Sequence, residues 1–413
     1  MVILGDDMGN NSKFIGSVLL LAGTIIGAGI LALPMVGVSA GFSWSVILMT
    51  MTWLLAVITG FFVLEVNLAL PSQHSSFSSM AEKTLGVSGK VVVWACTLFF
   101  LYALLVAYII GETNILVNYF SSALNIEISY KGTAILFTVI FGLAVFWSTA
   151  AADYVNRGLM SVKGVLIIAA LVLISPHIDI SKLVVGKSLL PQAKYIWMAV
   201  PIFLASYGYQ FIVPSLRMYL GDEVKKLRWV IIIGTVVSMT LYVWWLVAIF
   251  GVVPLEEMER SDVGRFTQQI IAIVNNEWVT KAINGFAIVT MTTAFIGVSL
   301  GLFDFLVDAL RRANDRWGRF QVAIATFVPP LMIAIFYPGG FIKALNYIGI
   351  PVAILTVILP PLMAYQLRKT KSPESYVYRV KCGNVTLLLV TVAGVGIAIV
   401  TVLSILQVLP GQT

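Results

Sequence analysis

Two stretches of the chain interrupt long apolar runs with glycine, proline and small polar residues. Residues 23–34 hold three glycines and end in Pro34, and residues 206–214 hold Gly208 among polar and aromatic residues and end in Pro214. Each glycine costs the interior of a helix roughly 1 kcal/mol, and each proline costs about 3 kcal/mol. A bilayer tolerates such breaks only where protein or a water-filled cavity satisfies the freed backbone groups. Both stretches therefore predict broken helices.

The ends of two broken helices offer complementary chemistry. The N-terminus of a half-helix presents unpaired N–H groups and a positive partial charge, which suit a carboxylate. The C-terminus of a half-helix presents carbonyl groups, which suit an ammonium group or a metal cation. Side by side, the two breaks fit a zwitterionic amino acid, whereas a single break would fit close helix packing through glycine equally well.

The composition places these breaks in a membrane. Of the 413 residues, 59% are apolar and 11% are charged, against about 25% charged residues in a soluble domain. So few charges cannot cover a water-facing surface of this size, which excludes a soluble enzyme, a disordered chain and a nucleic-acid binder. The sequence instead predicts an all-α integral membrane protein in contact with the lipid bilayer.

Eleven stretches are long and apolar enough to span a bilayer, which takes about 20 residues. We expect these spans near residues 14–36, 42–70, 91–120, 132–150, 159–176, 195–216, 229–251, 281–307, 320–337, 341–366 and 384–409. Spans 1 and 6 hold the breaks and cross in opposite directions, which is the pattern of a 5+5 inverted repeat around a transporter's central site. We expect one transporter domain with repeats at 14–176 and 195–366 and an extra span 11 at 384–409.

Basic residues predict the orientation, because cytoplasmic loops are enriched in Lys and Arg. The side that holds the N-terminus carries 18 of the 26 Lys and Arg residues, and the other side carries 8. This asymmetry predicts a cytoplasmic N-terminus and, after eleven spans, a C-terminus on the outside. It also accounts for the net charge of +7 without a nucleic-acid partner.

Ionisable residues inside spans are candidate functional groups. Lys163 in span 5 is either a lysine that extends to the cytoplasmic surface or a proton carrier, since a lysine among apolar groups releases its proton when its surroundings change. Glu65 in span 2 is expected to be a paired or gating charge. Glu112 in span 3 either faces an outer vestibule or lies at a helix end near water. Asp304 in span 8 is expected to pair with arginines at the membrane surface.

Three motifs that resemble enzyme or cofactor sites fail. Gly186-Lys187-Ser188 resembles the end of a phosphate-binding loop, but Ser181 stands where the upstream glycine belongs. Gly27-Ala28-Gly29 follows no strand, as a dinucleotide site requires. The only histidines, His74 and His177, are on opposite sides of the membrane. We therefore expect no cofactor, no metal, no ATP and no enzymatic activity.

Several longer motifs match a known family. They are residues 22–34, the Glu65 end of span 2, Ser206-Tyr207-Gly208-Tyr209 with Val213-Pro214-Ser215, residues 226–230, residues 295–306 and residues 336–341. With these motifs the chain resembles the bacterial hydroxy and aromatic amino acid permeases over nearly its whole length. The resemblance is greatest to the tyrosine and tryptophan permeases.

The resemblance implies a leucine-transporter-like fold and proton-driven uptake of an aromatic amino acid, with tyrosine as our first choice, across a bacterial inner membrane. It also implies that Lys163 matches a lysine of similar permeases and stands where sodium-driven relatives bind their ion. Gln210 departs from the family, which usually has a histidine there, and it cannot carry a proton. The candidate substrate-binding residues are Thr24, Gly27, Ala28, Gly29, Tyr108, Ser206, Tyr207, Gly208, Tyr209 and Gln210, with Tyr207 and Tyr209 as an aromatic wall.

Alternatives remain at this point. The preferred substrate is tyrosine in our interpretation, with tryptophan, phenylalanine or a hydroxy amino acid such as serine or threonine as alternatives. Sodium coupling is an alternative to proton coupling, because Thr290, Thr292 and Thr293 offer hydroxyl groups to an ion. A channel is the alternative from another class, and it would conduct without accumulating its substrate.

Overall fold

The computed structural model describes residues 3–71, 76–125, 127–147, 149–184, 196–259, 262–310, 316–370 and 376–406. All regular structure in these ranges is helical. The first half contains α1 (Ile3–Ile25), α2 (Gly29–Gly37), α3 (Phe42–Ala69), α4 (Phe77–Leu124), α5 (Tyr130–Trp147), α6 (Thr149–Ile174), η2 (Ser175–His177) and α7 (Ile180–Val184). The second half contains α9 (Ile196–Ala205), η3 (Gln210–Ile212), α10 (Val213–Leu220), α11 (Val224–Val252), α12 (Leu255–Glu259), α13 (Val263–Val274), α14 (Glu277–Ala309), α15 (Arg316–Phe336), α16 (Phe341–Tyr347), α17 (Gly349–Val352), the π-helical η4 (Ala353–Ile358), α18 (Leu359–Thr370) and α19 (Asn384–Ile405).

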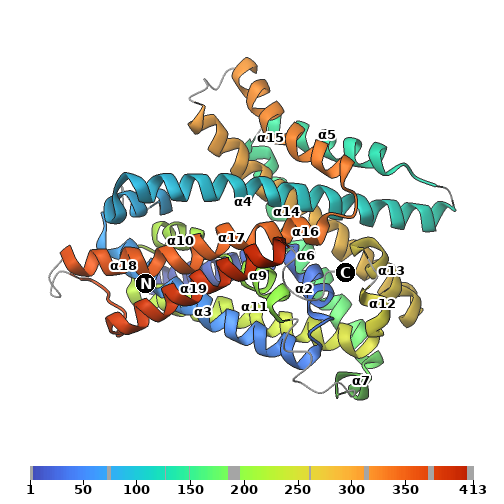
Figure 1. Cartoon of the computed structure of the whole chain (residues 1–413), viewed down its shortest axis with the longest axis horizontal. Helices are drawn as coiled ribbons and strands as arrows, with labels where there is room; N and C mark the ends of the chain where they lie inside the picture. Colours follow the sequence, from blue (N-terminus) through green and yellow to red (C-terminus); the bar gives the residue numbers. More distant parts are fainter. Residues whose placement is uncertain are drawn as a thin grey trace.

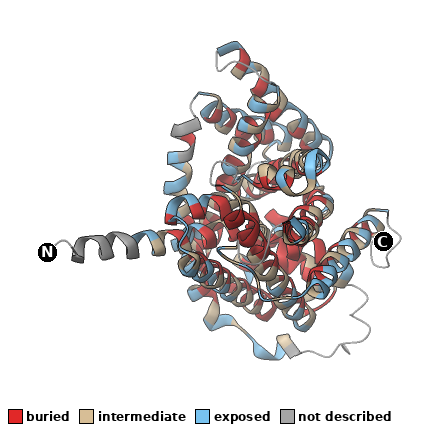
Figure 2. Ribbon diagram, turned by 90° about the vertical axis from the view of Figure 1, so that its left-hand side faces the viewer, coloured by how far each residue is buried: buried red, intermediate tan, exposed pale blue. Residues whose placement is uncertain are grey.

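The helices are those of a polytopic membrane protein. Within the described ranges, ten helices are long and apolar enough to cross a bilayer, and there are eleven when the bent pair α1–α2 counts as one span. Most of the long helices run along the long axis of the molecule (Figure 1). Figure 2 shows the molecule from the left-hand side of the first view. Buried residues gather between the helices, and exposed residues lie toward the outside. The exposed face is itself apolar on a helix such as α19, where Leu388 and Leu389 are both 63% exposed, as expected of a surface that faces lipid.

The two predicted breaks are present and lie side by side. Residues 12–25 and α2 meet at an angle of 47°, and span 6 is divided into α9, the short η3 and α10. A methyl group on Gly29 would lie only 2.9 Å from the Ser206 hydroxyl. The absence of a side chain at Gly29 therefore allows this close approach of the two breaks.

Some element boundaries differ from those predicted. Span 3 continues from a helix that starts at Phe77, and the chain turns at Gly86, whose φ of 75° suits a residue without a Cβ. The polar stretch at residues 252–280, between spans 7 and 8, contains α12, α13 and the start of α14. Span 10 consists of α16, α17, η4 and α18 instead of one regular helix.

Candidate functional site

The chain leaves helical geometry between α1 and α2. The Gly27 N–H donates to the Ile25 carbonyl at 2.7 Å, and the Ile30 N–H donates to the Gly27 carbonyl at 3.3 Å. In the described part of the chain, the amides of Ala28 and Gly29 have no backbone hydrogen-bond partner, as is usual at the start of a helix. They lie at the positive end of α2 and suit a carboxylate group.

The break in span 6 follows from its own residues. α9 ends at Ala205, whose carbonyl accepts the Gly208 N–H at 3.1 Å, and the chain resumes regular α-helix only at Val213. Pro214 stands in the first turn of α10, where its missing N–H removes no helical hydrogen bond. The backbone from Ser206 to Gly208 is therefore not part of a regular helix.

Tyr242 of α11 joins the two breaks. Its hydroxyl donates to the Ile25 carbonyl at 2.6 Å and lies 3.1 Å from the Ser206 carbonyl. The side chain is fully buried, and its ring packs edge-on against Tyr207 with centroids 5.6 Å apart. The sequence analysis missed this residue, because Tyr242 lies in an ordinary apolar span and no local motif marks it.

Lys163 of α6 points into the protein. Its ammonium donates to the Ile26 carbonyl at 2.6 Å, and the side chain is 4% exposed. The alternative of a lysine that extends to the membrane surface is therefore wrong. The ammonium lies just beyond the C-terminal end of α1, where the helix dipole favours a positive charge.

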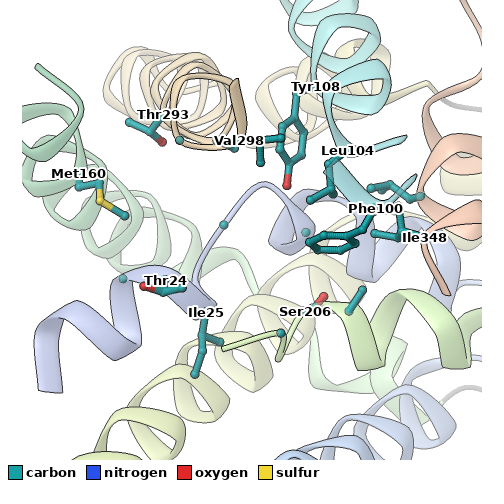
Figure 3. A pocket seen from close by; sticks show the side chains of 18 of the residues that line it. Thr24, Ile25, Phe100, Leu104, Tyr108, Met160, Ser206, Thr293, Val298 and Ile348 are labelled. Carbon is teal, nitrogen blue, oxygen red and sulfur yellow. The ribbon is translucent and has the colours of Figure 1, made fainter. Parts of the chain in front are cut away.

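A cavity of about 280 Å³ lies between the two breaks and the helices α4, α6 and α14. Seven of the predicted site residues line it, namely Thr24, Gly27, Gly29, Tyr108, Lys163, Ser206 and Gly208. Figure 3 shows the hydroxyl of Tyr108 pointing into the cavity and Phe100, also from α4, beside it. Phe100, Leu104 and Ile348 give the cavity an apolar wall, and the sequence analysis did not anticipate these three residues.

The predicted aromatic wall of Tyr207 and Tyr209 is wrong in this structure. The Tyr207 hydroxyl lies 2.9 Å from the Met49 sulfur, and the Tyr209 hydroxyl donates to the Ala56 carbonyl at 3.0 Å, so both rings point toward α3. Gln210 likewise donates from Nε2 to Thr59 at 3.1 Å.

These three side chains and that of Ala28 are absent from the cavity wall. The non-helical turn directs the side chains of Tyr207, Tyr209 and Gln210 toward α3 and away from the cavity. Of residues 206–210, only Ser206 and Gly208 line the cavity.

Residues 10–401 match the model of the tryptophan/tyrosine permease family. The chain belongs to this family. The permease is 32% identical to tyrosine-specific transport system 1 of Haemophilus influenzae, over 93% of this chain and 95% of that protein. It is also 32% identical to the tryptophan-specific transport protein of Pseudomonas aeruginosa, over 96% of each chain. The permease is therefore a multi-pass aromatic amino acid transporter and not an enzyme.

A solved structure shows the fold. The crystal structure of the Eremococcus coleocola manganese transporter, in complex with an aromatic bis-isothiourea substituted compound, matches 95% of the permease with a TM-score of 0.60. The match covers 86% of that chain, and the sequence identity is 14%. This likeness bears on architecture alone, and it agrees with the leucine-transporter-like fold that the resemblance implies.

Glu65 of the permease is paired, as predicted, and its partner is Arg368 of α18. The guanidinium donates from Nε to one carboxylate oxygen at 2.7 Å and from Nη2 to the other at 2.6 Å. The Val380 N–H donates to the same carboxylate at 2.9 Å. Glu65 is fully buried and Arg368 is 4% exposed, so this ion pair joins α3, α18 and the segment before α19.

A second ion pair ties α10 to α3. Arg217 binds Asp222 at 2.6 Å and donates to the carbonyls of Asn67 and Leu70 at the end of α3. The guanidinium holds the pKa of the Asp222 carboxyl below its ordinary value. Arg217 thus joins α10 to α3, and Tyr242 joins α11 to α1 and to the break in span 6.

Two further predicted charges are Glu112 and Asp304. Glu112 is 1% exposed, so it is neither in a vestibule nor near water. Asp304 is exposed and has no ion pair among the described residues. The arginines that follow it, Arg311 and Arg312, lie outside these residues, so its pairing stays a prediction. Residues 185–195, with the failed phosphate-loop motif, and His74 also lie outside the described residues. No group of three or more metal-binding side chains occurs in the ranges described above.

Proposed function

We propose that the permease imports L-tyrosine in symport with protons, by alternating access, across the bacterial inner membrane. The observation that carries this proposal is the contact of the Lys163 ammonium with the Ile26 carbonyl at 2.6 Å, at the edge of the cavity. It couples a group that can exchange a proton to the break that would bind the substrate. The proton gradient is the driving force, and the mechanism requires neither a cofactor nor ATP.

The cavity supports recognition of an aromatic amino acid at three points. The substrate carboxylate would accept hydrogen bonds from the Ala28 and Gly29 amides at the start of α2. Its ammonium group would meet carbonyls of the two breaks, and its ring would pack on Phe100 and Tyr108. The Tyr108 hydroxyl, which points into the cavity (Figure 3), offers a hydrogen bond to the phenol of tyrosine.

Lys163 supports proton coupling through its position. As an ammonium it holds the end of α1 to α6, because it donates to the Ile26 carbonyl. When it loses its proton, the attraction to the helix C-terminus is lost, and α1 is free to separate from α6. The protonation state of one side chain would thus be coupled to the position of the broken helix.

The joined helices support alternating access. Tyr242 and Arg217 connect α1, α3, α10 and α11, while α4, α6 and α14 form the opposite side of the cavity. Movement of the first group against the second would open the cavity to one side of the membrane and then to the other. Lys163 spans the boundary between the two groups.

Competition uptake tests the substrate. Proteoliposomes with the purified permease take up labelled tyrosine in the presence of excess unlabelled tyrosine, tryptophan, phenylalanine, serine or threonine. We expect strong inhibition by tyrosine, weaker inhibition by tryptophan and phenylalanine, and none by serine or threonine. Inhibition by serine equal to that by tyrosine would overturn an aromatic site, and stronger inhibition by tryptophan would replace tyrosine as the substrate.

A further inference from the structure

Glu112 of α4 is a buried carboxyl group with one unused oxygen. The side chain is 1% exposed, and Oε1 accepts a hydrogen bond from the Thr292 hydroxyl of α14 at 3.2 Å. Oε2 has no hydrogen-bond partner in the described structure. Glu112 lies one helical turn, or about 6 Å along the axis, beyond the cavity residue Tyr108. It therefore adjoins the cavity on the side that the basic residues predict to be outside.

No cation compensates this carboxyl group. The ionisable side chains near this half of α4, on α4 itself and on the outer ends of α5, α13, α14 and α16, are Tyr102, Tyr108, Tyr119, Tyr130, Lys131, Arg265, Glu277, Lys281, Lys343 and Tyr347. Among the described residues, none forms a salt bridge with Glu112; Arg265 and Lys281 pair instead with Asp262 and Glu277. A buried carboxylate without a cation is strongly disfavoured, and such a group takes up a proton instead.

The outer half of α4 is covered by elements that the sequence analysis did not foresee. α13 packs so closely on α4 that a methyl group on Gly264 would overlap the Asn114 backbone and lie 2.5 Å from Asn118 Nδ2. Asn114 also donates from Nδ2 to the Pro338 carbonyl at 3.2 Å, in the turn between α15 and α16. α12 and α13 lie at the same end of the molecule as the C-terminal end of α4 (Figure 1). These contacts cover α4 between Glu112 and its outer end, and Glu112 itself is 1% exposed.

We propose that Glu112 is a second proton-binding site, which must be filled from the outside before the outer side of the permease closes over the substrate. The inference rests on the proposed alternating access but not on the role of Lys163. In an outward-open state Glu112 is wet and can ionise. When the outer side closes, Glu112 returns to its contact with Thr292, away from water. Only the protonated acid can lie there without leaving an unpaired buried charge.

The rate of exchange falls as the external pH rises. Closure needs the protonated form, so raising the external pH removes the proton from the open state and slows every cycle that requires closure. Each required proton adds one unit to the limiting downward slope of log rate against pH. The Glu112→Gln substitution replaces the acid by a neutral amide that needs no proton, and it should remove this one unit and leave the contribution of any other group.

Tyrosine exchange in proteoliposomes tests the proposal, because exchange needs outer closure but no ion gradient. Vesicles loaded with unlabelled tyrosine exchange it for labelled tyrosine, with the internal pH fixed and the external pH varied. We expect the slope of log rate against external pH in E112Q to be shallower than in the wild type by about one unit at high pH. The matched control is Glu277→Gln, which removes an exposed carboxylate from the outer end of α14 and should leave the slope unchanged.

Either an unchanged slope in E112Q or an equal effect of E277Q would overturn the proposal. If E112Q fails to fold, infrared spectra of the wild type and Glu112→Asp give the second measurement. A carbonyl band of a protonated carboxylic acid at neutral pH, shifted in Glu112→Asp, supports the proposal, and the absence of that band contradicts it. If the wild type exchanges tyrosine but never accumulates it, proton symport is wrong, but the exchange slopes still test the role of Glu112.

Discussion

The last two carbonyls before the first break are each held by a side chain from another helix. Tyr242 of α11 binds the Ile25 carbonyl, and Lys163 of α6 binds the Ile26 carbonyl. The first contact joins helices on one side of the cavity, and the second crosses to the other side. At the scale of single residues, Tyr242 therefore positions the site and Lys163 couples it.

The first prediction concerns Lys163. We expect Lys163→Ala to abolish accumulation of tyrosine against its gradient while it preserves part of the exchange activity, because the substrate site keeps its backbone. Gradient-driven uptake and exchange, measured in the same proteoliposomes, separate the two effects. Lys182→Ala is the matched control, since Lys182 also donates to a backbone carbonyl, that of Val252, but is exposed and distant from the breaks. Normal accumulation in Lys163→Ala would contradict the assignment.

The second prediction concerns the Tyr242 hydroxyl. Tyr242→Phe keeps the ring packed on Tyr207 but removes the donor that the two breaks share. A net hydrogen-bond contribution of about 1 kcal/mol predicts a loss of about fivefold in tyrosine affinity, measured as the concentration for half-maximal exchange. Tyr102→Phe is the control, because its hydroxyl binds the Ala325 carbonyl away from the cavity. Equal losses of affinity in both variants would show that Tyr242 has no special positioning role.

The sequence predicted the backbone of the site better than its side chains. Gly27, Gly29 and Gly208 mark the breaks because a helix cannot easily contain them, and all three line the cavity. Tyr209 was misplaced because its direction depends on the non-helical turn and on space beside α3. That space exists because Gly60 lacks a side chain, and a methyl group there would overlap the Tyr209 ring. Such a match between residues far apart in the chain has no local signal.

At the scale of elements, the buried ion pair between α3 and α18 fixes the inner ends of spans 2 and 10. Arg368 contacts both carboxylate oxygens of Glu65 and the carbonyls of Val380 and Cys382. The guanidinium of α18 thus binds α3 and the segment before α19, and it joins all three elements. Removing it leaves a fully buried carboxylate that keeps the hydrogen bond from the Val380 N–H but has no cation to pair with among the described residues.

The third prediction follows from this arrangement. Arg368→Met should lower the free energy of unfolding by about 3–5 kcal/mol, because Glu65 remains buried and uncompensated. The double variant Glu65→Gln/Arg368→Met should be less destabilised than Arg368→Met alone. Unfolding in mixed micelles measures both values, and Lys281→Ala, which breaks an exposed pair, should leave the unfolding midpoint unchanged. A double variant as unstable as the single one would contradict the account.

The elements themselves were largely predictable, and the exceptions have physical causes. Span 2 was predicted at 42–70 and forms Phe42–Ala69, because an apolar run bounded by Gly41 and Pro71 leaves little choice. Span 10 was predicted as one regular helix, yet it contains η4 directly before Pro360 and Pro361. There the Leu359 N–H donates to the Ile354 carbonyl, five residues back, as in a π-helix. The hydropathy of the sequence does not reveal this change from α-helix to π-helix.

At the scale of the whole molecule, the orientation in the membrane decides which face of the cavity receives substrate. The basic residues predict that the connection between spans 6 and 7 is cytoplasmic and that α12 is outside. The permease has two cysteines, Cys96 and Cys382, and both are free thiols. Replacing both by serine gives a background for cysteine labelling.

The fourth prediction uses two exposed positions in that background. Lys225→Cys should react with a membrane-impermeant thiol reagent only after the cells are opened, and Glu256→Cys should react in intact cells. Both side chains are exposed in the structure, so both positions react once the membrane is breached. Reaction of Lys225→Cys in intact cells, with none at Glu256→Cys, would reverse the orientation and exchange the inner and outer sides throughout.

The most direct test of the central claim is labelled tyrosine uptake into proteoliposomes with an alkaline interior, in sodium-free buffer. We predict accumulation above the external concentration that collapses when a protonophore is added, since the cavity would then couple substrate to a proton. Uptake that appears only after sodium is supplied, or tyrosine that equilibrates without ever accumulating, would contradict proton symport.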